Sequence, residues 1–208
     1  MDERTHTHCI AFAGARRIAA GDLAEVGLKA KEAIDRGREQ VLLFDAATSE
    51  PIDLDFRGTP ADLLKRLARA AVPASVAAGP EHGAPRGPGR PKLGVVAREV
   101  TLLPRHWEWL SGQPGGASVA LRKLVEQARR DNDGRDRTRR AQESAYRFMS
   151  AMAGDRPGFE EATRALFAGD RARFARLVKP WPADVRDHAK KLAAVALGPV
   201  AQGAGAVR

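Results

Sequence analysis

Residues 41–56 read VLLFDAATSEPIDLDF, and this stretch is the clearest β-forming segment of the chain. Its first five residues form a short apolar run, which is typical of a buried strand. In residues 52–56, apolar side chains alternate with aspartates, which gives a strand one apolar and one polar face. Residues 46–50, which lie between them, fit a hairpin loop. We therefore expect paired strands at 41–45 and 52–56.

The flanking residues complete a small α+β unit. Residues 8–14, HCIAFAG, indicate another short strand, and apolar residues recur at helical spacing over 20–35. A further helix is expected after Thr59, which is a good N-cap. The predicted element order of residues 1–72 is therefore β-α-β-β-α.

Beyond this unit the sequence predicts four more segments. Residues 73–93 alternate Gly and Pro, which indicates a flexible basic linker, and residues 94–133 predict a strand, a helix, a turn and a helix. Residues 134–197 predict a helical region that could receive a protein partner. The Arg- and Asp-rich stretch 129–140 is expected to be a solvated helix junction whose charges pair locally, and the alternative is a segment that tracks phosphates. The Gly- and Ala-rich residues 198–208 are expected to form a disordered tail.

The positive charge of the chain is concentrated in its middle. The 208 residues carry a formal net charge of +9. Residues 1–80 hold 11 Lys or Arg against 12 Asp or Glu, whereas residues 81–140 hold 13 against 7. A basic segment favours a polyanionic partner such as nucleic acid. We therefore expect any anion-binding residues beyond residue 80.

Composition also excludes several classes of protein. A single cysteine, Cys9, excludes an intramolecular disulfide framework and is typical of a reducing cytoplasm. The N-terminus lacks the apolar run of a secretory signal, and no stretch approaches the roughly 18 apolar residues of a membrane span. We expect a cytoplasmic protein with no membrane partner.

Residues 98–130, REVTLLPRHWEWLSGQPGGASVALRKLVEQARR, resemble the ribbon-helix-helix family of bacterial DNA-binding proteins. The matching features are a β-prone segment ending at Pro104, an amphipathic helix, and a second helix that Ser118 is expected to cap. The resemblance implies a homodimer, because the strand pairs with its copy from a second chain. It further implies that the ribbon enters the major groove, and that the amides near Gly116 hold a backbone phosphate.

The sequence supports dimerisation through this segment better than it supports direct reading of DNA bases. Pro104 and Ser118 are 14 residues apart, nearly one helical turn less than in that family. Two of the positions that would face the groove, Val100 and Leu102, are apolar and cannot hydrogen-bond to base edges. The expected dimer interface consists of Val100, Leu102, Leu103, Trp107, Leu121, Leu124 and Val125.

A second DNA-binding motif lies just before this segment. Gly89, Arg90, Pro91 and Lys92 resemble part of an AT-hook, which lays arginines along the minor groove of A·T-rich DNA. The alternative interpretation is a basic flexible linker. The expected DNA-binding residues are Arg86, Gly89, Arg90, Pro91, Lys92, Arg98, Thr101, Gly116, Ser118, Arg122 and Lys123.

No motif of the sequence supports catalysis, a metal or a cofactor. The chain has no phosphate-binding loop, no dinucleotide fingerprint and no hydrolase or zinc-protease motif. Of the residues that could carry chemistry, Trp107 is expected in a core, Trp109 on the opposite, exposed side, and His188 on a helix surface. We expect no enzyme.

Four segments together resemble a full-length bacterial family, domain of unknown function 2239. They are REVTLLPRHWEWL, GGASVALRKLVEQAR, AYRFMSAMAGDRPGFEEATRALFAGD and WPADVRDHA. This resemblance covers nearly the whole chain and implies no activity or binding residues. The function expected from the residues is a homodimeric DNA-binding protein in a regulatory role. The alternative is a non-catalytic, dimeric protein-interaction or scaffold module.

Overall fold

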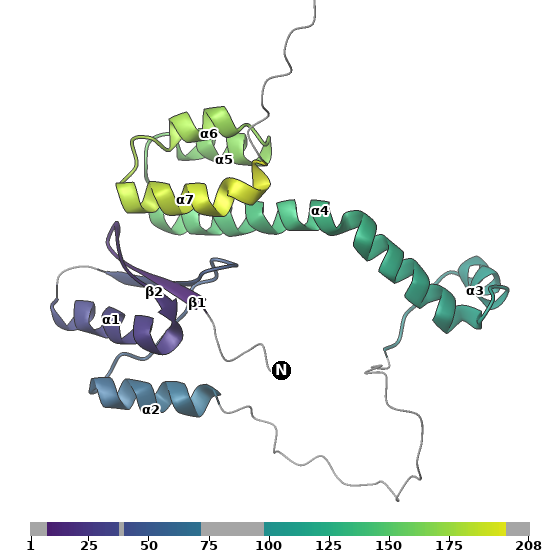
Figure 1. The fold of residues 1–208 in the computed structure, drawn as a ribbon, viewed down its shortest axis with the longest axis horizontal. Coiled ribbons are helices and arrows are strands. Elements are labelled where there is room, and N and C mark those ends of the chain that lie inside the picture. Colours follow the sequence, from purple (N-terminus) through teal and green to yellow (C-terminus); the bar gives the residue numbers. More distant parts are fainter. Residues whose placement is uncertain (1–7, 38–39, 72–97, 199–208) are drawn as a thin grey trace, which may run out of the picture. The chain divides into compact units, whose positions relative to one another are not determined.

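The structure, a computed structural model, describes residues 8–37, 40–71 and 98–198. It is an α+β protein, as expected, with a three-stranded sheet and seven helices in this part of the chain (Figure 1). The elements are β1 (His8–Ala13), β2 (Arg16–Asp22), α1 (Leu23–Asp35), β3 (Val41–Asp45), α2 (Pro60–Ala71), α3 (Pro104–Ser111), α4 (Gly116–Ala153), α5 (Phe159–Phe167), α6 (Arg171–Leu177) and α7 (Ala183–Ala196). The predicted linker 73–93 and all of the predicted tail except Gly198 lie outside the described residues.

The chain divides into two compact units. The sheet unit contains residues 1–72 and 134–208, and the central unit contains residues 73–133. The boundary at residue 133 falls inside α4. Among the helices that the structure describes, none has the length and apolarity needed to cross a bilayer.

The first two strands form a hairpin that the sequence does not predict. β1 pairs antiparallel with β2, with Ala13 opposite Arg16, and Gly14 in the turn has a φ of 53°. The predicted helix over 20–35 is therefore too long, and the element order is β-β-α-β-α. β2 lacks a regular apolar alternation, and its register shifts opposite Ala11 and Phe12.

Local capping sets the bounds of α1. The Asp22 carboxylate accepts a hydrogen bond from the Glu25 amide at 2.9 Å, so the helix begins at Leu23. Gly37 has a φ of 69°, in the left-handed region, and its amide donates to the Ile34 carbonyl as the helix ends.

β3 confirms the predicted strand at 41–45, but its predicted partner at 52–56 is wrong. The sheet order is β2-β1-β3, so β1 rather than 52–56 pairs with β3. Residues 52–56 form no strand. Of their backbone amides in the described structure, only that of Ile52 donates to β3, to the Leu43 carbonyl at 2.9 Å. The alternation still predicts burial, because the apolar side chains of 52–56 pack against the core beneath α1. The alternation of apolar and polar residues therefore predicts which side chains are buried, but it does not predict whether the backbone pairs with a neighbouring strand.

α2 begins where the sequence predicts. The Thr59 hydroxyl accepts from the Asp62 amide at 3.2 Å, and the Asp62 carboxylate accepts from the Thr59 amide at 2.9 Å. This reciprocal pair satisfies two amides that a helix start leaves without partners.

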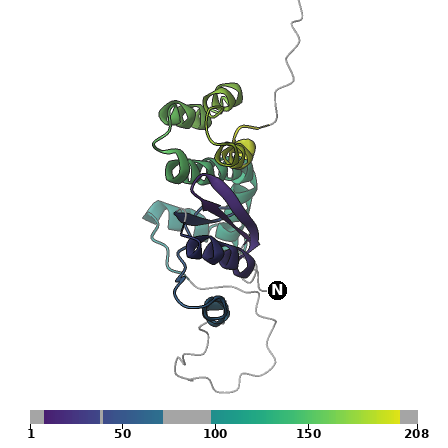
Figure 2. The ribbon, with the colours of Figure 1, turned by 90° about the vertical axis from the view of Figure 1, so that its left-hand side faces the viewer.

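The sheet carries a separate hydrophobic core on each face. Cys9, Ala11 and Leu43 pack toward α1. Ile10, Phe12 and Phe44 pack on the other face, against the C-terminal part of α4 and against α5, α6 and α7. Figures 1 and 2 both show α1 on one side of the sheet and α4 and α7 on the other. Helices distant in sequence thus complete the core of the N-terminal sheet.

A buried polar contact also ties the loop after β3 to α4. The hydroxyls of Ser49 and Ser144 lie 2.9 Å apart, and both side chains are buried. On the surface nearby, the Arg147 guanidinium donates to the Thr48 carbonyl. Ser49 adopts a φ of 56°, so the buried hydrogen bond is made at some backbone cost.

Residues 134–197 are mostly helical, as expected, with one correction. α4 ends at Ala153, just before Gly154, and Asp170 caps α6 by accepting from the Arg173 amide at 2.9 Å. The predicted helix junction within 129–140 is wrong, because α4 runs unbroken for 38 residues. Its only strong helix-destabilising residue there is Gly134, which costs only about 1 kcal/mol relative to alanine.

Candidate nucleic-acid interface

The segment before α3 is extended but forms no strand. Residues 98–103 have no strand partner within the described chain, so the predicted strand is not confirmed. In a ribbon-helix-helix protein the partner strand would come from a second chain. The rest of the segment differs as well, since the second helix extends 38 residues. The structure does not bear out the ribbon-helix-helix resemblance.

α3 and α4 form a helix-turn-helix arrangement. α3 begins at Pro104, as predicted, and its last carbonyls are satisfied by the amides of Gly112 and Gln113. Gly115 and Gly116 have φ values of 85° and 73°, which turn the chain into α4. Ser118 is the third residue of α4 and not its N-cap, because these glycines start the helix two residues earlier.

The N-terminal half of α4 has two chemically different sides. At about 100° per residue, Leu121, Leu124, Val125 and Ala128 lie within one arc of the helix. Arg122 and Arg129 lie beside this arc, next to Val125, and Lys123 and Arg130 lie opposite it, so the four cations form a separate basic arc. Leu124, Val125 and all four cations are exposed, with Val125 retaining 65% of its accessible area. One side therefore suits an apolar partner and the other a polyanion.

Acidic side chains neutralise part of the basic arc, as the pairing interpretation predicts. The Glu126 carboxylate accepts from Arg129 at 3.0 Å and from Arg130 at 3.3 Å, and these hydrogen bonds and charges hold its pKa below the usual value. Further along, Asp136 pairs with Arg139 at 3.2 Å. Within the described chain, Lys123 has no acidic partner, and Arg122 donates only to the Ser118 carbonyl at 3.1 Å.

The structure describes only part of the predicted DNA-binding set. Arg86, Gly89, Arg90, Pro91 and Lys92 lie outside the described residues. The remaining six lie along the extended segment and the first two turns of α4, and all are exposed except Gly116, which is half-buried: Arg98, Thr101, Gly116, Ser118, Arg122 and Lys123.

The predicted dimer residues are mostly exposed in the single chain. Val100, Leu103, Trp107, Leu124 and Val125 are exposed large hydrophobic side chains. Leu102 and Leu121 are half-buried. The prediction that Trp107 is a core residue is wrong, since it keeps 40% of its area exposed, and Leu110 is the buried residue of α3. α3 has only eight residues and buries Leu110, while its two tryptophans, Trp107 and Trp109, are exposed to solvent.

His188 is a second correction. It is buried, not on a helix surface, because it follows Val185 by three residues on the apolar side of α7 and small alanines beside it leave room. Both ring nitrogens are buried without a hydrogen-bond partner in the described structure. Burial, followed by the charges of Lys191 and Arg17, lowers the pKa of His188 to about 4.

The residues with potential for metal or nucleophilic chemistry are dispersed. No three His, Cys, Asp or Glu side chains of the described ranges gather as metal ligands do. Cys9 is buried, and desolvation, aided by Asp22 and Asp45, raises the pKa of its thiol to about 11. A thiol with that pKa is a poor nucleophile at neutral pH.

The sheet unit also carries a local group of cations that the net charge of residues 1–80 does not reveal. Arg16 and Arg17 lie together on β2 and line a hollow, although residues 1–80 carry a net charge of −1. The two adjacent arginines are evident in the sequence, but they line a hollow only because they lie on β2, a strand that the sequence does not predict.

Comparison with known proteins identifies a family without an assigned activity. A family model described as "Uncharacterized protein conserved in bacteria" matches residues 8–193. No curated protein and no solved structure matches the chain.

Proposed function

We propose that this chain, which belongs to the bacterial family DUF2239, is a homodimeric DNA-binding protein whose central unit contacts the duplex. The observation that carries the proposal is the separation of charge and apolarity on α4. The basic arc of Arg122, Lys123, Arg129 and Arg130 does not overlap the apolar stripe of Leu121, Leu124, Val125 and Ala128, and its members Lys123 and Arg130 lie opposite that stripe. A helix of this kind can dimerise on one side and bind an anion on the other.

The basic arc is suited to the phosphate backbone rather than to base edges. Arginine and lysine side chains on a helix bind phosphates without reading sequence. The start of α4 adds amides with a partial positive charge close to Arg122 and Lys123. The segment that resembles part of an AT-hook, with Arg90 and Lys92 and with Arg86 before it, would add minor-groove contacts. We therefore propose strong electrostatic binding with modest sequence preference.

The first test is the salt dependence of binding. Affinity for a duplex in a mobility assay is expected to fall steeply between about 50 and 200 mM salt, because phosphate contacts release counterions. The double variant Arg122→Gln and Lys123→Gln is expected to weaken binding and reduce the salt slope by roughly 2, about 0.9 for each lost phosphate contact.

The control is Arg171→Gln with Arg173→Gln on α6, a pair of exposed arginines outside the central unit. This pair is expected to leave the slope unchanged. Absence of any shift at low salt, or equal losses in both double variants, would show that the central unit does not bind DNA.

The second test addresses the dimer. Leu124→Glu places a charge in the apolar stripe and is expected to convert the dimer to a monomer in sedimentation velocity, since burying an unpaired carboxylate is costly. Leu64→Glu, at another exposed leucine on α2, is the matched control and should leave the mass unchanged. A wild-type chain that sediments as a monomer, or a Leu124→Glu variant that stays dimeric, would contradict the assigned interface.

A scaffold function is the second candidate. Its support is the apolar surface of the central unit, where Trp109 keeps 54% and Val100 keeps 55% of its area exposed. Exposed tryptophans are frequent at the centres of protein interfaces. A chain that dimerises through the α4 stripe but gives no DNA shift at low salt would favour this candidate.

A further inference from the structure

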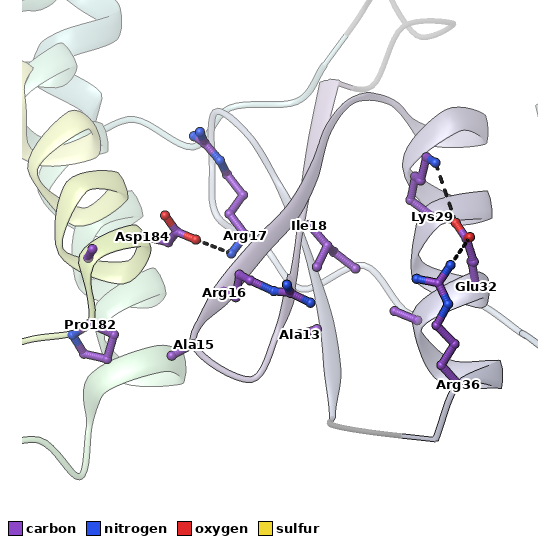
Figure 3. A pocket seen from close by; sticks show the side chains of 12 residues that line it. Ala13, Ala15, Arg16, Arg17, Ile18, Lys29, Glu32, Arg36, Pro182 and Asp184 are labelled. Atoms are coloured by element: carbon purple, nitrogen blue, oxygen red, sulfur yellow. Dashed lines mark hydrogen bonds and ion pairs between the residues drawn. The ribbon is translucent and has the colours of Figure 1, made fainter.

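A hollow of about 910 Å³ lies within the sheet unit, beside the edge strand β2. Its walls come from the β1–β2 hairpin, from α1 and from the start of α7, as Figure 3 shows. The volume is within the range of small-molecule sites, about 300–1,000 Å³. The hollow is therefore large enough for a ligand the size of a nucleotide.

Cations outnumber carboxylates in the lining. Arg16, Arg17, Lys29 and Arg36 contribute four positive charges, against Glu32 and Asp184. Both carboxylates are already engaged, because Glu32 pairs with Lys29 at 3.6 Å and with Arg36, and Asp184 accepts from the Arg17 amide at 2.9 Å. No carboxylate of the described chain pairs with the guanidinium groups of Arg16 and Arg17.

The strand places these two guanidinium groups on different sides of the hollow. Arg17 lies opposite Phe12, whose ring packs against His188 of α7, and Arg16, the residue before Arg17, points to the other face of the strand. Arg16 thus lies on the α1 side, and Figure 3 shows its side chain extending toward that helix. Arg17 lies on the α7 side, where its charge contributes to the lowered pKa of His188.

Guanidinium groups match the geometry of phosphate oxygens and form short, charge-assisted hydrogen bonds with them. A ligand that reaches both arginines must carry anionic oxygens over some length. We propose that this hollow binds a small diphosphate, such as inorganic pyrophosphate or the diphosphate of a nucleotide. The hydrogen bond from the Arg17 amide to Asp184 joins the hairpin, which carries both arginines, to α7.

Isothermal titration of the full-length chain tests the site, with pyrophosphate and ADP as probes at constant ionic strength. We expect one site per chain and at least tenfold weaker binding in the variant Arg16→Gln with Arg17→Gln. The matched control, Arg171→Gln with Arg173→Gln, removes the same charge from exposed positions on α6 and should bind as the wild type does.

Two results would overturn the diphosphate site: no binding of either probe, or equal binding by the wild type and the Arg16 and Arg17 variant. A chain that binds DNA but binds neither pyrophosphate nor ADP would also overturn the diphosphate site. The variant is expected to keep the mobility shift of the wild type, because neither arginine belongs to the central unit. Failure of the diphosphate site and failure of DNA binding are therefore distinguishable.

Discussion

Replacing Phe148 with alanine is expected to lower the free energy of unfolding of the sheet unit by about 3–5 kcal/mol. Phe148 is fully buried on α4, and its ring centroid lies 5.3 Å from that of Phe12 and 5.5 Å from that of Phe44. It also lies 4.6 Å from the His188 ring on α7. One side chain therefore joins two strands to two helices that are distant in sequence.

The large effect follows from the position of this contact. The apolar face of the N-terminal sheet is completed only by the C-terminal helices, so truncating Phe148 leaves a cavity between them. A cavity adds its own cost to the lost burial, since the surroundings relax only in part. A loss of this size is a large fraction of the 5–15 kcal/mol that stabilises a typical domain.

Urea unfolding followed by Trp181 fluorescence measures this effect in the sheet unit alone. Trp181 is buried in the same core, and replacing Trp107 and Trp109 with phenylalanine leaves it as the single tryptophan of the chain. In that background Phe167→Ala is the control, because Phe167 is 51% exposed, and its loss is expected to be below about 1 kcal/mol. Equal losses for the two variants would contradict a shared core of sheet and helices.

Local signals predicted those elements of the fold that depend on local interactions. β3 matches its predicted bounds, and α2 begins next to Thr59, because a short apolar run and a capping residue act within a few positions. β2 was missed because its residues, RRIAAGD, contain neither an apolar run nor a regular alternation, and its register shifts opposite Ala11 and Phe12. Residues 52–56 looked like a strand, but the pairing with β3 stops after an isolated bridge between Phe44 and Pro51 and the hydrogen bond from Ile52 to Leu43.

The candidate sites show the same limit. Helical spacing alone separates the apolar and basic arcs of α4, so that surface was predictable from the sequence. The hollow at Arg16 and Arg17 was not, because it requires β2 beside both α1 and α7, which are some 150 residues apart along the chain. A net charge summed over 80 residues averages away such a local excess of cations.

Acidification from pH 6.5 to pH 4 is expected to cost the sheet unit about 3 kcal/mol through His188 alone. His188 is 5% exposed, and its ring lies beside those of Phe12 and Phe148. Neither ring nitrogen has a hydrogen-bond partner in the described structure. Burial and the nearby charges of Lys191 and Arg17 lower its folded-state pKa from 6.5 to about 4. Protonation in the fold would therefore bury an unpaired positive charge.

The direction follows from which state takes up the proton first. In the unfolded chain His188 protonates near pH 6.5, while in the folded chain it stays neutral until about pH 4. Between these values the unfolded state binds more protons, so stability rises with pH. The contribution of His188 is fully present above pH 6.5 and is lost as the pH falls toward 4.

His188→Leu removes the titrating group while nearly conserving its volume, and it also removes two buried nitrogens without partners. Its stability at pH 7 is expected to equal or exceed that of the wild type, because a buried polar atom without a hydrogen bond costs about 1–3 kcal/mol. The difference between variant and wild type, followed by Trp181 fluorescence at pH 7, 6, 5 and 4.5, should widen steadily with acid. His106→Leu, at an exposed position of α3, should run parallel to the wild type. If His188→Leu also runs parallel, the imidazole is not held neutral in the folded core, and the contact of α7 with Phe12 and Phe148 must admit water.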